Sequence, residues 1–278
     1  MEIDCTLSSP EISREILIAF LADIGCESFE ETENGVKAYI STCYTPQFMP
    51  LLDEVIEKCS HIGFSCSYKI KNMEQKNWNA VWESNYESVV IDKQCYIRAP
   101  FHPARTDVKY EILIEPKMSF GTAHHETTAQ MISYLLTENC EDKTVLDMGS
   151  GTGILAILAA MRGAKRVLAI DIDTWAYENG KENVERNNIH TIETICGNAD
   201  NIKDAPYDIL IANINRNILL QDMEKYAQAM TAGSVLLLSG FYQNPDLPIL
   251  IEEAAKYNIK FHSFKVKNDW AAARFVKN

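Results

Sequence analysis

The 278-residue sequence has no apolar run near the about 18 residues that a membrane-spanning helix needs, which argues against a helical membrane protein. Its first residues, Met-Glu-Ile-Asp, lack the basic start and apolar core of a signal peptide, so we expect a cytoplasmic protein. Its eight cysteines form no Cys-x-x-Cys pair, which favours reduced thiols and argues against a zinc site. The hydrophobic fraction of 46% is typical of a globular protein with an ordinary core.

Positive charge is also scarce. The chain has 26 Lys and Arg against 39 Asp and Glu, a net charge of −13. Residues 1–70 alone hold four basic and twelve acidic side chains, a balance of −8. This excess disfavours binding to a nucleic-acid backbone, which requires basic residues. It fits either a basic protein partner or a solvated surface that aids solubility.

Two common phosphate-binding motifs are missing from the one glycine-rich turn. Residues 145–153 read Val-Leu-Asp-Met-Gly-Ser-Gly-Thr-Gly, between an apolar strand-like run and an apolar helix-like segment. Glycines at 149, 151 and 153 with Ile154 after them do not give the G-x-G-x-x-G of a dinucleotide fold. No Gly-Lys-Ser/Thr follows, so a P-loop is excluded as well.

Two acids decide which cofactor suits this turn. Asp147 just before the glycines would repel a pyrophosphate but attract a cationic amino group. Asp171 ends the next apolar run, 22 positions after Gly149, near the offset of about 20 residues expected for an acid that binds a ribose. S-adenosylmethionine carries an ammonium, a sulfonium and a ribose but no phosphate. We therefore interpret residues 144–171 as a βαβ unit that binds S-adenosylmethionine.

The hydrophobic pattern divides the chain into three parts. Residues 1–72 follow the order strand, helix, strand, strand, helix, strand, with Glu33-Asn34-Gly35 as a hairpin turn, which predicts a ferredoxin-like α+β domain. Residues 73–86 predict a helical linker, with Trp78 and Trp82 on one face. Residues 87–278 predict a second, α/β domain.

Strands and helices alternate from residue 127 onward, which predicts a mostly parallel, doubly wound sheet of seven strands covered on both faces. The last two strands, separated only by Asn268 and Asp269, are expected to form an antiparallel hairpin. Ligands of such sheets bind at the carboxyl ends of the strands, where Asp147, Asp171 and Asn213 fall. Strands are predicted at 144–148, 166–171, 191–196, 208–213, 233–239, 259–267 and 271–277, and helices at 127–138, 153–162, 174–187, 215–229 and 246–257.

Three further segments point to one family. Segment 119–128 reads Ser-Phe-Gly-Thr-Ala-His-His-Glu-Thr-Thr, segment 211–214 reads Ile-Ala-Asn-Ile, and segment 77–83 is rich in tryptophan. With the glycine turn, they make the sequence resemble the PrmA family, class I methyltransferases that modify large-subunit ribosomal protein eleven. The resemblance spans most of the chain and is weakest in residues 1–70. It implies a protein N-methyltransferase that modifies lysine side chains or an N-terminal amine, with the first domain recognising the substrate.

The resemblance also assigns roles to residues of this chain. It implies that Thr128, Gly149, Asp171 and Asn213 contact S-adenosylmethionine, with Asn213 also orienting the incoming amine. Gly151 belongs to the same turn, Asp147 is expected to balance the cofactor ammonium, and Ile172 and Asn198 to border the adenine. The partner would be the ribosomal protein, with no nucleic acid, membrane or metal required, and the enzyme is expected to be a monomer.

Several alternatives remain open from the residues themselves. A base or glutamine methyltransferase often has Pro-Pro and an aromatic residue after the motif that Asn213 occupies, whereas Ile-Asn-Arg follows here. An NAD-dependent oxidoreductase is opposed by Ile154 and Asp147. A non-catalytic cofactor-binding module stays possible because Ala123 replaces the usual glycine of the Phe-Gly-Thr-Gly segment, where a positive φ would strain alanine by about 1 kcal/mol or more.

Thr128 has a structural alternative as a helix-capping or first-turn residue, and Asn213 has one as the cap of the next helix. His124 and His125 suggest a metal site, but no third ligand has convincing spacing, so local hydrogen bonding by these loop histidines is favoured.

Overall fold

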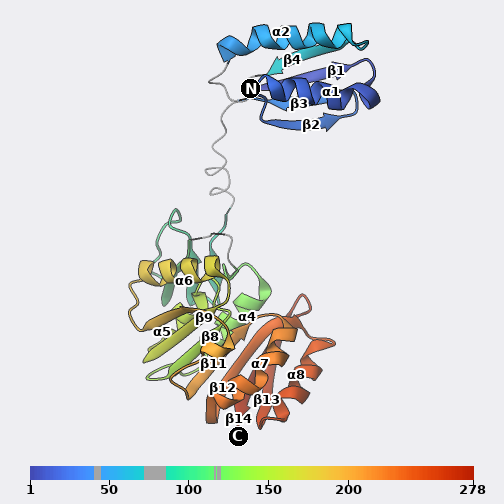
Figure 1. Cartoon of the computed structure of the whole chain (residues 1–278). Helices are drawn as coiled ribbons and strands as arrows, with labels where there is room; N and C mark the ends of the chain where they lie inside the picture. The colour runs from blue at the N-terminus through green and yellow to red at the C-terminus, as the bar shows by residue number, and fades with distance from the viewer. Residues whose placement is uncertain (41–44, 72–85, 116, 118–119) are drawn as a thin grey trace. The chain divides into compact units, whose positions relative to one another are not determined.

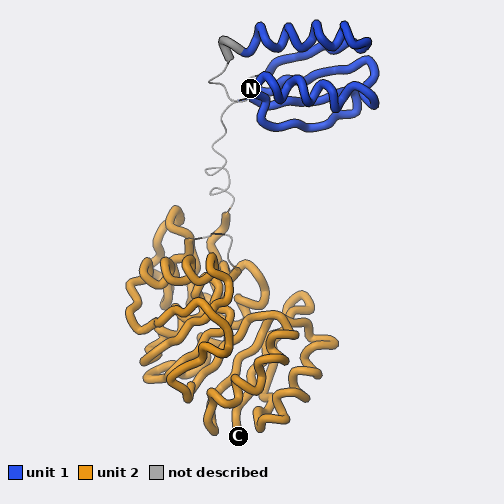
Figure 2. The backbone as a smooth tube through the Cα atoms, in the orientation of Figure 1, with its two compact units in different colours: residues 1–82 blue, residues 83–278 orange. Residues whose placement is uncertain are grey.

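The chain forms two compact units, residues 1–82 and 83–278, each with its own core (Figure 2). The computed structural model describes residues 1–40, 45–71, 86–115, 117 and 120–278. The predicted linker helix over residues 73–86, with its two tryptophans, therefore lies almost wholly outside the described residues and stays a prediction.

The first unit has the predicted strand and helix order. Its antiparallel sheet runs β2-β3-β1-β4, and the β2–β3 hairpin turns at Glu33 and Asn34, as expected. The fully buried Ile3, Leu17 and Leu52 bring strand and helix side chains into one core. The elements are β1 (Glu2–Leu7), α1 (Pro10–Asp23), β2 (Ser28–Thr32), β3 (Gly35–Tyr39), α2 (Thr45–His61) and β4 (Cys66–Lys71).

The second unit opens with a small three-stranded sheet. β5 (Val89–Ile91) pairs antiparallel with β6 (Cys95–Arg98), which pairs parallel with β7 (Tyr110–Leu113). Two asparagines at the C-terminal end of helix α6 (Thr174–Arg186), Asn183 and the C-cap Asn187, hold the end of β7 and the residues after it in place. The Asn187 side chain bonds both the N–H and the carbonyl of Leu113, and Asn183 Oδ1 accepts from the Glu115 N–H at 2.9 Å. These bonds tie the segment that leads toward the Phe-Gly-Thr loop to the main fold.

The main sheet of the second unit has seven strands in the order β10-β9-β8-β11-β12-β14-β13. Neighbouring pairs are parallel from β10 to β12, whereas β14 is antiparallel to both β12 and β13. The predicted doubly wound sheet and its terminal hairpin are thus confirmed. The strands are β8 (Thr144–Met148), β9 (Arg166–Asp171), β10 (Ile192–Cys196), β11 (Tyr207–Asn213), β12 (Met230–Tyr242), β13 (Ile259–Lys267) and β14 (Trp270–Lys277).

Helices cover both faces of this sheet (Figure 1). Alternating side chains of one strand enter different cores: Val145 packs with α4, α5 and α6, whereas its neighbour Leu146 packs with α7 and α8. Burial on both faces explains why Val145 and Leu146 of β8 are apolar at successive positions. The helices are α4 (Glu126–Leu135), α5 (Ile154–Met161), α7 (Arg216–Gln228) and α8 (Asp246–Ala255), besides α6.

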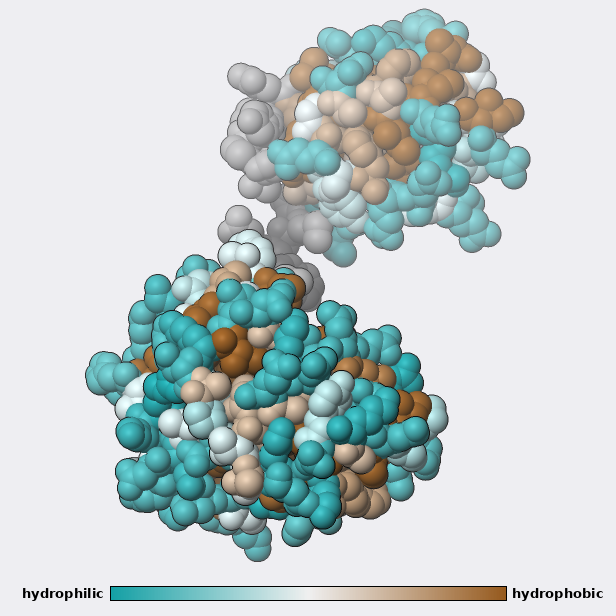
Figure 3. Space-filling model, turned by 60° about the horizontal axis from the view of Figure 1, so that its bottom comes forward, coloured by the Kyte–Doolittle hydropathy of each residue, from teal (hydrophilic) through white to brown (hydrophobic). Residues whose placement is uncertain are grey.

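The side chains just before the helices start them. Asp173 Oδ1 accepts from the Ala176 N–H at 2.9 Å to cap α6, and Asn215 Oδ1 accepts from the Ile218 N–H at 3.2 Å to cap α7. The face of the second unit seen in Figure 3 is covered mainly by hydrophilic residues. No helix among the described residues is long and apolar enough to cross a membrane.

Candidate functional site

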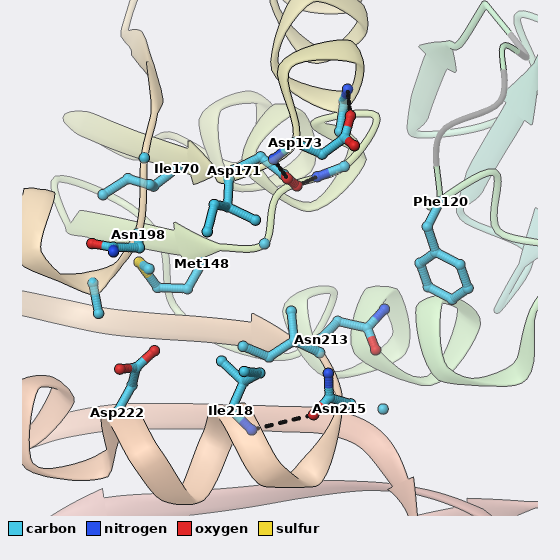
Figure 4. Close-up of a pocket in the computed structure, with 18 of the residues that line it drawn as sticks. Phe120, Met148, Ile170, Asp171, Asp173, Asn198, Asn213, Asn215, Ile218 and Asp222 are labelled. Atoms are coloured by element: carbon cyan, nitrogen blue, oxygen red, sulfur yellow. Dashed lines mark hydrogen bonds between the residues drawn. The ribbon is translucent and has the colours of Figure 1, made fainter.

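A cavity of about 1200 Å³ opens at the carboxyl ends of β8, β9, β10 and β11 (Figure 4). This is the edge at which ligands of open α/β sheets bind. Its walls come from the glycine turn after β8, the loops after β9 and β10, the start of α7, and Trp270 at the start of β14. Segments that are far apart in the sequence therefore meet at a single site.

The glycine turn brings bare backbone to the cavity wall. Gly149 has φ +67°, and a Cβ built there would lie 2.2 Å from Ile214 Cγ2. Gly151 has φ +55°, and its Cβ would lie 2.3 Å from the Phe120 carbonyl oxygen. Neither position accepts a side chain, so both the turn and the loop that carries Phe120 depend on glycine.

Asp171 connects the turn to the next strand. One carboxylate oxygen accepts from the Gly151 N–H at 2.7 Å and the other accepts from the Asp173 N–H at 3.0 Å. Asp171 lines the cavity and is partly exposed to it. Each oxygen retains a further lone pair, so the carboxylate is fixed in place and still able to accept hydrogen bonds from a diol.

Asp147 lies behind the turn and does not line the cavity. It is 1% exposed, and its Oδ2 accepts from the Ala156 N–H in the first turn of α5 at 3.1 Å. Its Oδ1 has no hydrogen-bond partner among the described residues. Burial raises the pKa of this carboxyl to about 7, a rise that the Ala156 N–H partly opposes. This buried position behind the turn disfavours the direct contact with a cofactor ammonium that the sequence suggested.

Asn213, the last residue of β11, faces the cavity next to the glycine turn (Figure 4). Its Nδ2 donates to the hydroxyl of Thr128 on α4 at 3.3 Å. Its Oδ1 is buried without a hydrogen-bond partner among the described residues. The cap of α7 is Asn215, so the structural alternative for Asn213 is wrong. Thr128 does lie in the first turn of α4, but its hydroxyl also orients Asn213.

Aromatic rings form the wall beyond Asn213. Phe120 meets His125 edge to face with ring centroids 5.3 Å apart, and His125 meets Trp270 in the same way at 4.8 Å. Tyr242 also lies against Trp270, with ring centroids 4.3 Å apart. The first three rings line the cavity. They give the wall of the cavity an apolar surface.

The loop histidines have local roles. His125 bonds the Thr127 hydroxyl at 2.8 Å and begins α4, and His124 bonds the Thr122 hydroxyl and the Glu87 carbonyl. Ala123 lies between Thr122 and His124 and has φ +67°. In this conformation an alanine is strained and a glycine is not. Among the described residues, no cluster of three or more His, Cys, Asp and Glu is arranged to hold a metal ion.

Charged groups gather around the rest of the cavity. The lining includes four carboxylates and two ammonium groups, an excess of negative charge that suits a cationic ligand. At the end far from the aromatic rings, Lys225 binds Asp200 at 2.6 Å and lies 3.6 Å from Asp222. The remaining two carboxylates, Asp171 and Asp173, flank the start of α6.

The structure brings together most of the residues that the sequence singled out. Six of the eight predicted cofactor-binding residues line the cavity, whereas Thr128 and Asp147 support it from behind; the six are Gly149, Gly151, Asp171, Ile172, Asn198 and Asn213. Their contact with the cofactor itself stays a prediction. Sequence reasoning missed Phe120, His125, Trp175, Asp222, Lys225 and Trp270 as lining residues.

Comparisons with known proteins identify the family of this chain. The family model for ribosomal protein L11 methyltransferase (PrmA) matches residues 15–278. The chain belongs to this family. Proteins named Ribosomal protein L11 methyltransferase from Phocaeicola vulgatus and Bacteroides thetaiotaomicron are each 44% identical to it, over 96% of this chain and 94% and 95% of theirs. The corresponding protein from Porphyromonas gingivalis is also 44% identical, over 96% of this chain and 91% of its own.

Solved structures confirm the fold. The crystal structure of ribosomal protein L11 methylase from Lactobacillus delbrueckii subsp. bulgaricus matches with a TM-score of 0.63 at 24% identity. The match covers 69% of this chain and 99% of the other. The large sheet is therefore a class I methyltransferase sheet, as the sequence predicted.

Proposed function

We propose that this member of the family uses S-adenosylmethionine to methylate amino groups of ribosomal protein L11, on lysine side chains or at the N-terminus. The observation that carries the proposal is the Oδ1 of the cavity-lining Asn213, which is buried and has no hydrogen-bond partner among the described residues, while the amide nitrogen bonds Thr128. An amine in this place would satisfy that oxygen by donating one N–H. Family membership supports the same substrate.

The residues present fit the proposed cofactor. Asp171 offers a fixed carboxylate for the two ribose hydroxyls, and the backbone at Gly149 and Gly151 admits the methionine part without a side chain in the way. Met148 and Ile170, which also line the cavity, supply apolar surface for the cofactor. The two lysines among the described lining residues, Lys117 and Lys225, belong to segments other than the glycine turn. When bound, S-adenosylmethionine supplies a methyl group on a positively charged sulfur.

The chain's own contribution to transfer is to position the amine and keep it neutral. Asn213 Oδ1 would accept one N–H and leave the nitrogen lone pair free to point at the methyl group. Phe120, His125 and Trp270 would exclude water from the amine, and such desolvation lowers the pKa of an ammonium group. The same ring faces stabilise the methylated, cationic product through cation–π contacts.

Asp147 and Thr128 act indirectly in this proposal. The bond from the Ala156 N–H to Asp147 fixes the start of α5 against the end of β8, and so shapes the turn between them. Thr128 holds the Asn213 side chain in place, since its hydroxyl accepts a hydrogen bond from Nδ2.

The first unit is proposed to recognise the protein substrate. Residues 1–70 carry a balance of −8, which would steer a basic ribosomal protein toward the enzyme and repel a nucleic-acid backbone. We further propose that the enzyme works in the cytoplasm as a monomer, without a direct nucleic-acid partner.

Purified protein, incubated with methyl-labelled S-adenosylmethionine and a mixture of large-subunit ribosomal proteins, tests the proposal. We expect label in L11 alone, in acid-stable N-methyl amino groups. Label in RNA or in a glutamine side chain would contradict the substrate assignment. Binding of S-adenosylhomocysteine without any labelled product would indicate a non-catalytic cofactor-binding module.

A further inference from the structure

One buried carboxylate in the cavity has no task in the mechanism above. Asp222 lies on α7, its side chain is 8% exposed, and it lines the cavity at the end far from Asn213. Figure 4 shows its carboxylate directed from α7 toward the loop that carries Asn198. None of the described residues donates a hydrogen bond to its Oδ2. Its Oδ2 is not one of the buried atoms without a partner, so it is open to the cavity and can meet a ligand there.

The surrounding charges partly compensate this carboxylate. Lys225 Nζ lies 3.6 Å from Oδ1, as an ion pair rather than a close hydrogen bond, and is drawn to Asp200 at 2.6 Å. Desolvation raises the pKa of the Asp222 carboxyl, whereas Lys225 lowers it. Tyr226, one turn along α7, is fully buried, and its hydroxyl has no hydrogen-bond partner among the described residues, so it does not supply the missing donor.

The position relative to Asp171 indicates which ligand group arrives here. If Asp171 holds the ribose and the glycine turn holds the methionine part, the base extends to the opposite side, between the loop after β10 and α7. Apolar side chains there, Ile172 and Ile218, suit the two faces of a flat ring. The ring edge then needs a polar partner at the end of the cavity.

Asn198, which the sequence placed beside the adenine, is less free to provide that partner. Its Oδ1 accepts from the Asp200 N–H at 2.8 Å, and its own N–H donates to Asn201 Oδ1 at 3.0 Å. Both bonds belong to the capping of the short 3-10 helix Ala199–Asn201. Oδ1 of Asn198 thus already accepts one local hydrogen bond, whereas Oδ2 of Asp222 accepts none from the described residues.

We propose that Asp222 is the residue that selects adenine, by accepting a hydrogen bond from the exocyclic amino group of the cofactor. The inference rests on the proposed function, since it requires S-adenosylmethionine in this cavity. A carboxylate accepts from the amino group of adenine but repels the carbonyl oxygen that hypoxanthine has at the same position. Asp222 would therefore determine specificity for the base and act on binding, not on the methyl transfer itself.

The experiment compares three ligands by calorimetry: S-adenosylhomocysteine, its inosine analogue, and its purine riboside analogue, which lacks the amino group. We expect the full-length wild type to bind the adenosine compound at least about tenfold more tightly than either analogue, since a lost charged hydrogen bond costs on the order of 1.5–3 kcal/mol. Asp222→Asn should bring adenosine and inosine compounds within about threefold, because its amide can donate to the carbonyl.

Glu224→Gln is the matched control, because Glu224 is exposed on the same helix and does not line the cavity. It should keep the wild-type ratio. An unchanged preference in Asp222→Asn would overturn the inference while leaving the proposed function intact. Failure of the wild type to bind any of the three would overturn both. If the variant does not fold, the wild type decides alone: equal affinity for the adenosine and purine riboside compounds overturns the inference.

Discussion

Asn213 and Thr128, 85 positions apart in the sequence, share a hydrogen bond of 3.3 Å in which the Asn213 amide nitrogen donates to the Thr128 hydroxyl. An amide has two ends that differ chemically, and here the nitrogen is the end that contacts Thr128. Oδ1 is the end that remains without a partner among the described residues. The pair therefore presents an acceptor, as required to orient an amine and keep its lone pair free for the methyl group.

Replacing either partner should reduce methyl transfer more than cofactor binding. We expect Asn213→Ala to lower kcat by about 100-fold, the scale of loss when a reacting group is misplaced. Thr128→Val, which keeps the shape but removes the acceptor, should lower kcat by about tenfold because one hydrogen bond of about 1.4 kcal/mol orients the amide. Initial-rate assays with L11 as the substrate measure kcat for both variants. A rise in KM for L11 with unchanged kcat would contradict the orienting role.

Asp171→Ala should weaken the binding of S-adenosylhomocysteine by at least tenfold, because two ribose hydroxyls lose a charged acceptor worth on the order of 1.5–3 kcal/mol per bond. The same change frees the Gly151 N–H, so the turn itself would loosen. Asp173→Asn is the control, since it keeps an N-cap oxygen for the Ala176 N–H while removing a neighbouring charge. Calorimetry that shows equal losses in both variants would indicate a general charge effect instead of a ribose contact.

Asp147 predicts an unusual dependence of stability on pH. Its folded pKa is raised from 3.8 to about 7, so the folded state binds the proton more tightly than the unfolded state. The resulting stabilisation is complete below pH 3.8 and is lost as the pH rises to about 7, with a slope approaching about 1.4 kcal/mol per pH unit for one proton. Asp147→Asn should remove this component.

The measurement is the free energy of urea unfolding from pH 4 to 8 for the wild type and Asp147→Asn. Their difference isolates Asp147 from other carboxyls, and the variant should gain on the wild type as the pH rises. Because Asp147 does not line the cavity, the Kd of the variant for S-adenosylhomocysteine should stay within about threefold of the wild-type value. A tenfold change in Kd corresponds to about 1.4 kcal/mol of binding free energy. A 100-fold loss of affinity in the variant would instead support the direct contact with the cofactor ammonium that the sequence suggested.

The residues predicted from sequence have local patterns. Gly149, Gly151 and Asp171 follow apolar strands at fixed spacing, so the turn, the strand ends and their shared edge of the sheet can be deduced together. Trp270 and Asp222 have no such pattern. Trp270 reaches the cavity only because the terminal hairpin reverses direction and returns beside β12. Asp222 is one acid among many, and its burial depends on packing between α7 and the loop after β10.

The position of Asp147 shows a different limit. The sequence correctly indicates an acid before the glycines, but not which side of the turn its carboxylate occupies. The structure turns it toward the amide of Ala156, under the turn and away from the cavity. The pattern of residues was the same in either case, since an N–H at a helix start and an ammonium attract the same charge.

Ala123 allows a test of the one departure from the family pattern. Glycine at the φ of +67° of this residue would relieve about 1 kcal/mol of backbone strain. It would also remove a buried methyl group worth about 0.8 kcal/mol and raise the conformational entropy of the unfolded chain, and both effects lower stability. We therefore expect Ala123→Gly to change the free energy of unfolding by less than about 1 kcal/mol. Ala123→Val should cost at least about 2 kcal/mol, because a β-branched side chain tolerates this conformation poorly. A large gain in the glycine variant would show that strain outweighs burial.

The acidic first unit should govern the substrate and not the cofactor. Deleting residues 1–82 removes a compact unit with its own core and leaves every residue of the cavity in place. We expect binding of S-adenosylhomocysteine to persist and methylation of L11 to be lost, since the steering charge is gone. In the full chain, Glu11→Lys with Glu15→Lys, two exposed positions of α1, should raise KM for L11 at low salt, with kcat unchanged. Electrostatic steering weakens as the ionic strength rises, so this difference should shrink in about 0.5 M salt. Retained methylation after deletion would place substrate recognition in the second unit instead.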